Sequence, residues 1–352
     1  MDEPLLRAAL TARERRLRHA WRRRAAVWAL VALAVAATGW QLVRLGMVPS
    51  WTVVGRWWPA LVALAALVVA GVLWSRTRSS PTPLTGEGRW SRIGGMVTTV
   101  TAVGALVFTA ISLEATRDQI DVAREGQITD RFTRAIDQLS AEGSSNMHRR
   151  LGGIYALERI AVDSARDQAT MVEVLSAFLR STSPRAPGKP CGETRADVAA
   201  AFAVLARRDV SSDPRSQVID LRNLCLRKVR AVRGDVSRMS MIGSDLTGAN
   251  FAEARFGLTS LSRATLSGVY LFAADMTAGF VWADDADFTG AYLGYAKLGS
   301  TEFSGSTFVG ANFEGTDMGH ADFTGANLTD ATHNPRTRAA GARKGGTTGA
   351  WW

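Results

Sequence analysis

The stretch ADFTGANL, Ala321–Leu328, contains two short units with one pattern: a small residue, then a carboxylate or an amide, then a large apolar residue. The same pattern occurs at Ala249–Phe251 and at Ala311–Phe313. The units follow one another every five residues, whereas a helix repeats every 3.6 residues and a strand every two. The chain must therefore form a structure that turns after each five residues.

Large apolar residues keep this period over most of the C-terminal third. Thirteen units have their large residues from Leu221 to Val281, and after two extra residues nine more units follow from Phe288. We expect the extra residues to form a bulged corner at Trp282–Asp285. The second series is the predicted core: Phe288, Leu293, Leu298, Phe303, Phe308, Phe313, Met318, Phe323 and Leu328.

The residue two before each large residue is usually small, most often alanine, and glycine often stands two after it, as at Gly310 and Gly325. Glycine eases a turn, so each unit can end in a corner. Four corners close a square coil, and stacked coils can pair their backbones about 4.8 Å apart, as neighbouring strands do. No unit buries its own apolar face, so the core must come from stacking.

This A(D/N)LXX pattern over Ile219–Asp330 resembles the pentapeptide-repeat family. The resemblance implies a right-handed quadrilateral β-helix over residues 219–332, with about four units per coil and between five and six coils. Ile219, Leu224, Val229 and Met239 are large where alanine is usual, so the first coil is expected to be irregular. Residues 333–352 are basic and glycine-rich, and we expect them to form a disordered tail.

The N-terminal third carries three apolar stretches with almost no charge: Ala25–Val43, Trp57–Trp74 and Ile93–Leu113. A helix of about 20 residues crosses a hydrocarbon core of about 30 Å. We therefore predict a membrane region at 25–113, with two or three transmembrane helices, after a basic segment at 1–24. The number of crossings and their orientation stay open.

Two observations on orientation disagree. Residues 1–24 hold eight arginines, which favours a cytoplasmic N-terminus and, after three crossings, an external C-terminal part. The two cysteines, Cys191 and Cys225, argue against a disulfide framework and are typical of a reducing compartment; Cys225 is expected to face outward without a function. We expect an integral protein of the cell membrane with its helical and repeat domains in the cytoplasm.

A helical domain is predicted between membrane and repeats, at 114–210. Apolar residues at helical spacing occur in Thr129–Ser140, Leu151–Ser164, Asp167–Leu179 and Arg195–Arg208, with a Pro/Gly-rich loop at Ser181–Thr194. The string from TDRFTRAIDQLS to MVEVLSAFLR resembles a segment found between membrane helices and repeats in a group of bacterial membrane-associated pentapeptide-repeat proteins. That resemblance implies no activity.

The sequence contains no catalytic or cofactor motif. Its four histidines are far apart, its cysteines form no CxxC pair, and no phosphate loop or nucleophile elbow occurs. Asp284, Asp285 and Asp287 are a possible site for a hard cation, although a solvated acidic corner is the preferred interpretation. We expect a protein that is not an enzyme and that holds no cofactor or metal.

Charge divides the repeats into two parts. Residues 219–263 hold four acids and eight bases, whereas residues 264–333 hold nine acids and one base. We predict that an acidic face binds an unknown protein partner through Asp284, Asp285, Asp287, Asp317 and Asp322, and the charge of this face favours a basic partner. The predicted function is a membrane-anchored interaction scaffold, with the lipid bilayer as a second partner. Nucleic acid is an unlikely partner. Two alternatives remain: a DNA-mimicking regulator of DNA gyrase, which the resemblance suggests, and an accessory subunit of a membrane transport or signalling complex.

Overall fold

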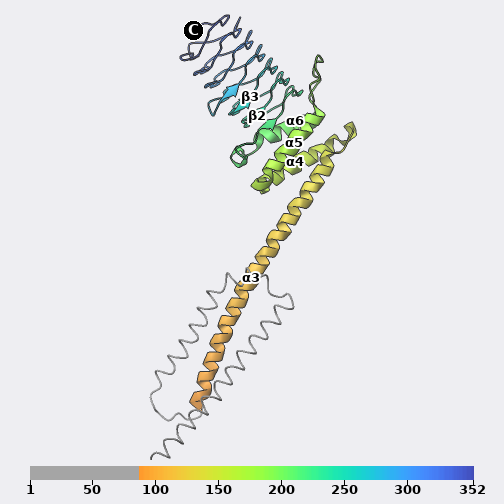
Figure 1. Ribbon diagram of the computed structural model, residues 1–352, viewed down its shortest axis with the longest axis vertical. Coiled ribbons are helices and arrows are strands. Elements are labelled where there is room, and N and C mark those ends of the chain that lie inside the picture. Colours follow the sequence, from red (N-terminus) through yellow and green to blue (C-terminus); the bar gives the residue numbers. More distant parts are fainter. Residues whose placement is uncertain (1–86) are drawn as a thin grey trace, which may run out of the picture. The chain divides into compact units, whose positions relative to one another are not determined.

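The computed structural model describes the backbone of residues 87–352 and the side chains of residues 104–105 and 108–352. Residues 106–352 form one compact unit, in which helices come first and repeats follow (Figure 1). The basic segment and the first two apolar stretches predicted from the sequence lie outside the described residues.

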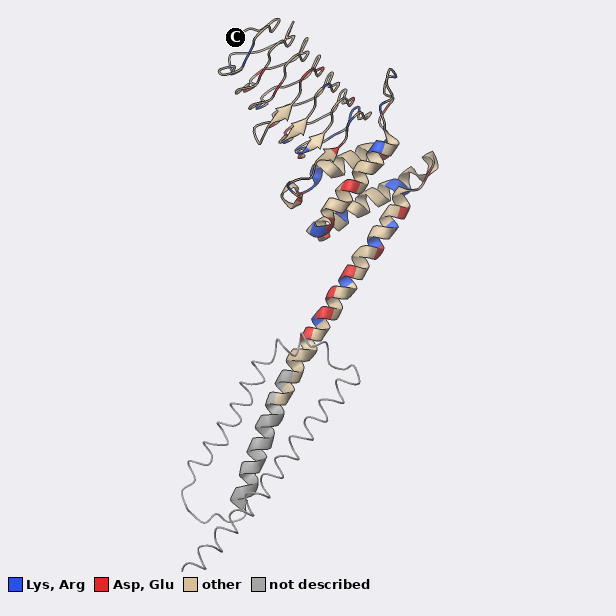
Figure 2. Ribbon diagram, in the orientation of Figure 1, with Lys and Arg blue, Asp and Glu red and all other residues tan. Residues whose placement is uncertain are grey.

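Helix α3, Glu87–Leu139, contains the third predicted apolar stretch. Within the part of the chain that the structure describes, no helix has both the length and the apolar character that a membrane crossing needs. Acidic and basic residues alternate along the C-terminal half of α3 (Figure 2). The last turn of α3 packs on the following helices through Ala135 and Leu139, which are buried.

Three further helices complete the helical domain: α4, Met147–Asp163; α5, Gln168–Thr182; and α6, Ala196–Arg207. Short 3-10 turns precede or follow them at Ser144–Asn146, Ala165–Asp167 and Val210–Ser212. Their apolar stripes meet in a core that includes Leu157, Leu175 and Phe202. The domain therefore buries the centre of each apolar stripe, while residues at the edges of the stripes, such as Phe132 and Phe178, are only partly buried.

The glycine pair Gly152-Gly153 is unfavourable inside a helix, yet α4 runs through it. A Cβ atom on Gly153 would lie 2.6 Å from the carbonyl oxygen of Ala135. The glycine therefore lets α3 and α4 approach more closely than any side chain would permit.

The repeats form a parallel β-helix. Its strands are β1, Ile219–Asp220; β2, Met239–Ser240; β3, Thr259–Ser260; and β4, Val281–Trp282. They pair in parallel in the order β1-β2-β3-β4. Single parallel bridges, such as Asp245↔Thr265 and Asn250↔Tyr270, connect residues twenty apart on the other sides. Four five-residue units therefore make one coil.

The interior of the β-helix is a continuous apolar column. The structure buries all nine residues of the predicted second series, none of which is more than 1% exposed. Phe288 and Phe308 stack with ring centroids 4.8 Å apart, and Phe303 stacks on Phe323 at 5.1 Å. Residues one coil apart in sequence are thus direct neighbours in the core.

The position of the two extra residues was predicted wrongly. Val281 pairs with Thr259, so it occupies the column that is usually small, and Ala283 takes the place of the large residue. Both are fully buried. Because Arg255 still pairs with Asp275, twenty residues on, the insertion must lie between Asp275 and Val281, at 277–280, and not at 282–285. A valine in a small position and an alanine in a large one concealed the true register.

Residues 333–352, predicted to be disordered, continue the β-helix. Asp317 pairs with Arg338 and Asp322 pairs with Arg343 in parallel bridges. The backbone of this last coil is ordered by hydrogen bonds to the coil before it, which need no apolar side chains. Trp351 packs 5.5 Å from Phe313 and Trp352 lies 5.6 Å from Phe323, ring centre to ring centre. The two tryptophans therefore cover the end of the phenylalanine column.

Helix α6 covers the opposite end of the column. Phe202 contacts Phe251 edge to face at 6.1 Å, and the carbonyl oxygen of Ala206 accepts a hydrogen bond from the Asp235 amide. Arg208 is 7% exposed; its guanidinium pairs with Asp213 at 2.9 Å and donates to the Ser237 carbonyl at 2.6 Å. The buried pair fastens the helical domain to the first coils.

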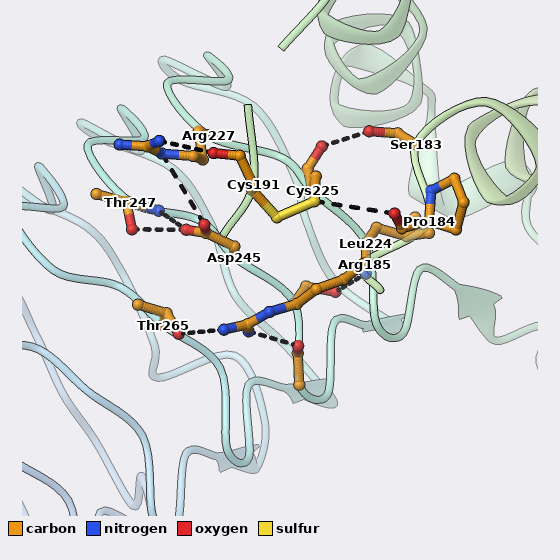
Figure 3. The surroundings of a disulfide bond; sticks show 12 residues. Ser183, Pro184, Arg185, Cys191, Leu224, Cys225, Arg227, Asp245, Thr247 and Thr265 are labelled. Carbon is orange, nitrogen blue, oxygen red and sulfur yellow. Dashed lines mark hydrogen bonds and ion pairs between the residues drawn. A yellow bond between two sulfur atoms is a disulfide. The ribbon is translucent and has the colours of Figure 1, made fainter. Parts of the chain in front are cut away.

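The prediction of unpaired cysteines was also wrong, because Cys191 and Cys225 form a disulfide (Figure 3). The loop that carries Cys191 runs along the edge of the first coils: Pro184 makes an antiparallel bridge with Leu224, and the Cys225 amide donates to the Ser183 carbonyl at 2.8 Å. Arg185 extends the contact by donating to the Gly243 carbonyl at 2.8 Å. A separation of 34 residues gave no sign of this pairing in the sequence.

Candidate functional site

The surface of the β-helix has four sides, which we call faces A to D in chain order. Each is formed by the outward residue that precedes a large inward residue, repeated once per coil. Face A passes through Thr265, and face B through Tyr270. Face C passes through Asp275, and face D through Trp282.

The predicted acidic site is divided among several sides. Asp287 lies on face A, Asp317 on face C and Asp322 on face D, while Asp284 and Asp285 form the corner after face D. The reason is the length of a coil: Asp287 and Asp317 are thirty residues apart, or one and a half coils, which places them on opposite faces. Acidic residues accordingly occur at scattered places on the coils in Figure 2.

Two of these aspartates have basic partners. Arg338 lies 3.2 Å from Asp317, and Arg343 lies 3.4 Å from Asp322, oxygen to nitrogen. Both arginines belong to the segment predicted to be a disordered tail. The excess of acids that the sequence shows between residues 264 and 333 is therefore partly balanced by the next coil.

Most of the outward Asp and Asn residues have a structural task. Asp287 Oδ1 accepts a hydrogen bond from the Thr289 amide at 2.9 Å, and Asn312 Oδ1 accepts one from the Glu314 amide at 2.8 Å. Such bonds to the amide two residues on stabilise a turn. At Asp322 the hydrogen bond from the Thr324 hydroxyl also holds the pKa of the carboxyl below its ordinary value. The regular spacing of Asp and Asn in the units of this chain therefore stabilises the corners, and does not by itself form a binding face.

Face B carries a group of aromatic side chains that the sequence analysis did not single out. Tyr270 and Tyr292, one coil apart, stack with centroids 4.9 Å apart and planes at 8°. Phe272 lies 6.1 Å from Tyr292, and Tyr295 meets Phe272 edge to face at 5.7 Å. We call these four residues the tyrosine cluster. Tyr270 is 40% exposed and Tyr295 is 46% exposed, so the cluster faces water.

Glycines make room for these rings. A Cβ atom on Gly294 would lie 3.0 Å from Cζ of Tyr292, and one on Gly315 would lie 2.9 Å from Cε1 of Tyr295. Arg336 of the last coil donates to the Tyr295 hydroxyl at 3.3 Å. Burial, with the neighbouring Tyr270 and Glu314, raises the pKa of Tyr292. A tyrosine hydroxyl has an ordinary pKa of about 10, so it is protonated at neutral pH and can donate a hydrogen bond.

The only sequence signal for the cluster is positional. Tyr270 and Tyr292 both precede a large inward residue, and they are 22 residues apart, which is one coil plus the two inserted residues. The two tyrosines are one coil apart even if the insertion is placed after Val281. This relation can be recognised in the sequence only when the number of residues per coil is known. Among the residues whose side chains the structure describes, no group of three or more His, Cys, Asp or Glu is placed to hold a metal ion.

A parallel β-helix of five-residue units defines a class of repeat fold. Residues 240–277, 286–325 and 308–332 match the family described as pentapeptide repeats, in eight copies, so the repeat region belongs to that family. A comparison with curated proteins found no match.

Solved structures similar to this chain include three pentapeptide-repeat proteins. Rfr23 from the cyanobacterium Cyanothece 51142 shares 21% identity over 34% of this chain and 63% of its own, with a TM-score of 0.18. HetL from Nostoc sp. strain PCC 7120, involved in heterocyst differentiation regulation, shares 18% over 44% and 80%, with a TM-score of 0.21. QnrB1, a plasmid-mediated fluoroquinolone resistance protein, shares 16% over 36% and 78%, with a TM-score of 0.18. The chain spans less than two thirds of the length of Rfr23.

Proposed function

We propose that this chain is a membrane-anchored, non-enzymatic scaffold whose β-helix binds another protein. The observation that carries the proposal is the tyrosine cluster. Protein interfaces are enriched in tyrosine and other aromatic side chains, which combine a large apolar area with a polar end. The rings on face B lie outside the apolar column, so their exposed area adds little to the core, while their hydroxyls can pair with a partner.

The test is copurification of the full-length chain from detergent-solubilised membranes. We expect a defined protein to copurify with it, and the double variant Tyr270→Ser/Tyr295→Ser to retain the partner at least about tenfold less well, which corresponds to about 1.4 kcal/mol. Thr307→Ser on face A is the matched control and should retain it. Equal retention by both variants, with equal melting temperatures, would exclude face B as the binding site. Copurification of an intact transporter or receptor complex would favour the accessory-subunit alternative.

Membrane anchoring is supported by the apolar stretches Ala25–Val43 and Trp57–Trp74, which lie outside the described residues and each have the length of a helix that crosses a bilayer. For orientation, the pairing of Cys191 with Cys225 removes the argument from free thiols on which the cytoplasmic expectation was based. Disulfides persist in oxidising compartments. Together with the arginine-rich segment 1–24, this favours a cytoplasmic N-terminus and an external β-helix, an arrangement that needs an odd number of crossings.

Thiol labelling tests this topology. The variant Cys191→Ser leaves Cys225 as a free thiol on the first coils. A membrane-impermeant maleimide should label it in intact cells, whereas the unreduced wild-type chain should stay unlabelled. Labelling of the variant only after lysis would place the β-helix in the cytoplasm and contradict the proposed orientation.

The gyrase alternative is not supported by the charge geometry. A protein that imitates a DNA rod needs a continuous row of negative charge, and the five predicted aspartates are spread over faces A, C and D and a corner. Asp317 and Asp322 are in addition paired with arginines.

A further inference from the structure

The outward residues at the centre of face B follow the same order in both directions along the β-helix. Parallel bridges align one residue of this face in each of six coils, which we number one to six: Arg230, Asn250, Tyr270, Tyr292, Asn312 and Thr332. Coils two to five therefore present asparagine, tyrosine, tyrosine and asparagine. If a second copy lies antiparallel on this face, with the two-fold axis between coils three and four, coil two faces coil five and coil three faces coil four. Each tyrosine then meets a tyrosine and each asparagine meets an asparagine, so the row is self-complementary.

Large side chains beside this row face small ones in the same arrangement. The Ala273 amide donates to the Gly294 carbonyl at 2.8 Å, which aligns coils three and four at this point. Phe272 of coil three therefore corresponds to Gly294 of coil four. By the same alignment Tyr295 of coil four corresponds to Ala273 of coil three. In the antiparallel pair each of the two rings covers the small residue of the second copy, and Tyr295, which is 46% exposed in a single copy, loses apolar area to the contact.

Charge favours the antiparallel pair over a parallel one. Coils three and four carry no charge on this face or its two corners, whereas the outer coils do: Arg227, Lys228, Arg230 and Arg233 in coil one, Glu253 in coil two, and Glu314, Asp330 and Arg336 in coils five and six. Lys228 and Asp330 occupy the same corner position, with φ of +56° and +57°, so the antiparallel pair brings these opposite charges together. Arg336 adds one like charge at that end, against the two acids. A parallel pair would instead place the four bases of coil one beside those of the second copy, and such like charges disfavour association.

We propose that face B binds a second copy of this chain in an antiparallel, two-fold symmetric pair. The inference rests on the function proposed above, because it takes face B as the binding side, and it names a second copy as the protein bound. Aromatic side chains form the centre of the contact and amide or charged side chains form its two ends, in keeping with the aromatic core and polar rim of protein interfaces. Six coils about 4.8 Å apart give a contact about 24 Å long. This contact is at the small end of specific interfaces, so the pair should be reversible and depend on concentration.

Thiol crosslinking between two tagged copies tests the register of the pair. The full-length, unreduced variants Asn250→Cys and Asn312→Cys carry different affinity tags and are mixed in detergent with a bismaleimide that spans about 10 Å, the distance between packed sheets. In the antiparallel pair, position 250 faces position 312 of the second copy, whereas the two positions 250 are three coils apart, about 14 Å along the axis. We expect at least about tenfold more crosslinked dimer from the mixture than from either variant alone.

Two further sets of variants complete the test. If either asparagine variant has a lowered melting temperature, Arg230→Cys and Thr332→Cys, at exposed positions of coils one and six, take its place. Adding Tyr270→Ser/Tyr295→Ser to both copies should reduce the dimer severalfold, whereas Thr307→Ser on face A should leave the yield unchanged.

The inference is overturned by equal yields from the mixture and the single variants, by a higher yield from one variant alone, as a parallel pair would give, or by a yield that ignores the tyrosine changes. Its failure can be separated from that of the proposed function. If no dimer is crosslinked but a different protein copurifies and is lost from the tyrosine double variant, only the choice of the second copy as occupant is wrong. If neither is seen, face B is not the binding side and the proposed function fails as well.

Discussion

Phe308 occupies the centre of the apolar column and offers the most direct test of the coil geometry. Its ring contacts those of Phe288, Phe303, Phe313 and Phe323, with centroids 4.8–5.5 Å apart, and it is fully buried. Replacement by alanine removes a whole ring and leaves a cavity that the stacked coils cannot easily fill. Truncations of this kind destabilise by about 3–5 kcal/mol.

For a unit of this size each kcal/mol lowers the melting temperature by about 2–4 °C, so Phe308→Ala should lower it by about 6–20 °C. Scanning calorimetry of the full-length chain in detergent measures the shift. The control is Thr307→Ala, one residue earlier on face A, whose backbone bridges to Asp287 and Asn327 do not need the side chain. It should change the melting temperature by no more than about 2 °C. Similar shifts for the two variants would refute the inward and outward assignment.

Three further predictions concern the register, a corner and the helical domain. Ala283→Asp places a charge in the core and should cost several kcal/mol, whereas Trp282→Asp, in an exposed position, should cost less than about 1 kcal/mol; similarly small costs for both variants, measured by thermal denaturation, would restore the insertion to residues 282–285. Gly319→Ala should destabilise more than Gly310→Ala, because both have positive φ but only at Gly319 would a Cβ meet backbone, 2.7 Å from the Gly299 carbonyl oxygen; equal melting temperatures would contradict the close approach. Burial raises the pKa of the Asp197 carboxyl, but hydrogen bonds and charge from Arg195 and Arg150 outweigh burial and hold the pKa below its ordinary 3.8. The ionised carboxyl therefore stabilises the folded chain fully above about pH 4. This contribution is lost as the pH falls through the lower pKa of the folded state. Asp197→Asn should remove this part of the acid sensitivity, and calorimetry between pH 5 and pH 2.5 that shows the same slope for both chains would exclude it.

The period of five was enough to predict the β-helix and its second series of core residues. That signal is strong because each unit repeats the same inward pair, and the core depends on nothing else. Local register was less visible. Val281 is a large residue at a position that is usually small, and Ala283 is a small residue at a position that is usually large. Only the backbone pairing of these residues with Thr259 and Glu302 shows whether the insertion lies before or after them.

The surface was harder to predict than the core. Which outward residues share a side depends on the number of residues per coil, so a list of acids close in sequence, such as Asp287 and Asp317, does not define a face. The disulfide and the last coil were missed for a related reason: each depends on a contact with a segment more than twenty residues away. Cys191 lies in a loop, and the Arg338 segment lacks large apolar residues, so neither carries a local signal.

Because one coil is four equal units, the length of an insertion decides what it does to the surface. The two residues at 277–280 are absorbed at a single corner, since pairs twenty apart before them become pairs 22 apart across them and every side continues in line. Duplication of one five-residue unit between Tyr270 and Tyr292 would instead rotate everything after it by a quarter turn, leave the phenylalanine column filled, and bring Tyr292 next to Asp275 in place of Tyr270. Gain or loss of a single unit would therefore place different outward residues next to one another on each face, while the same large residues continue to fill the interior.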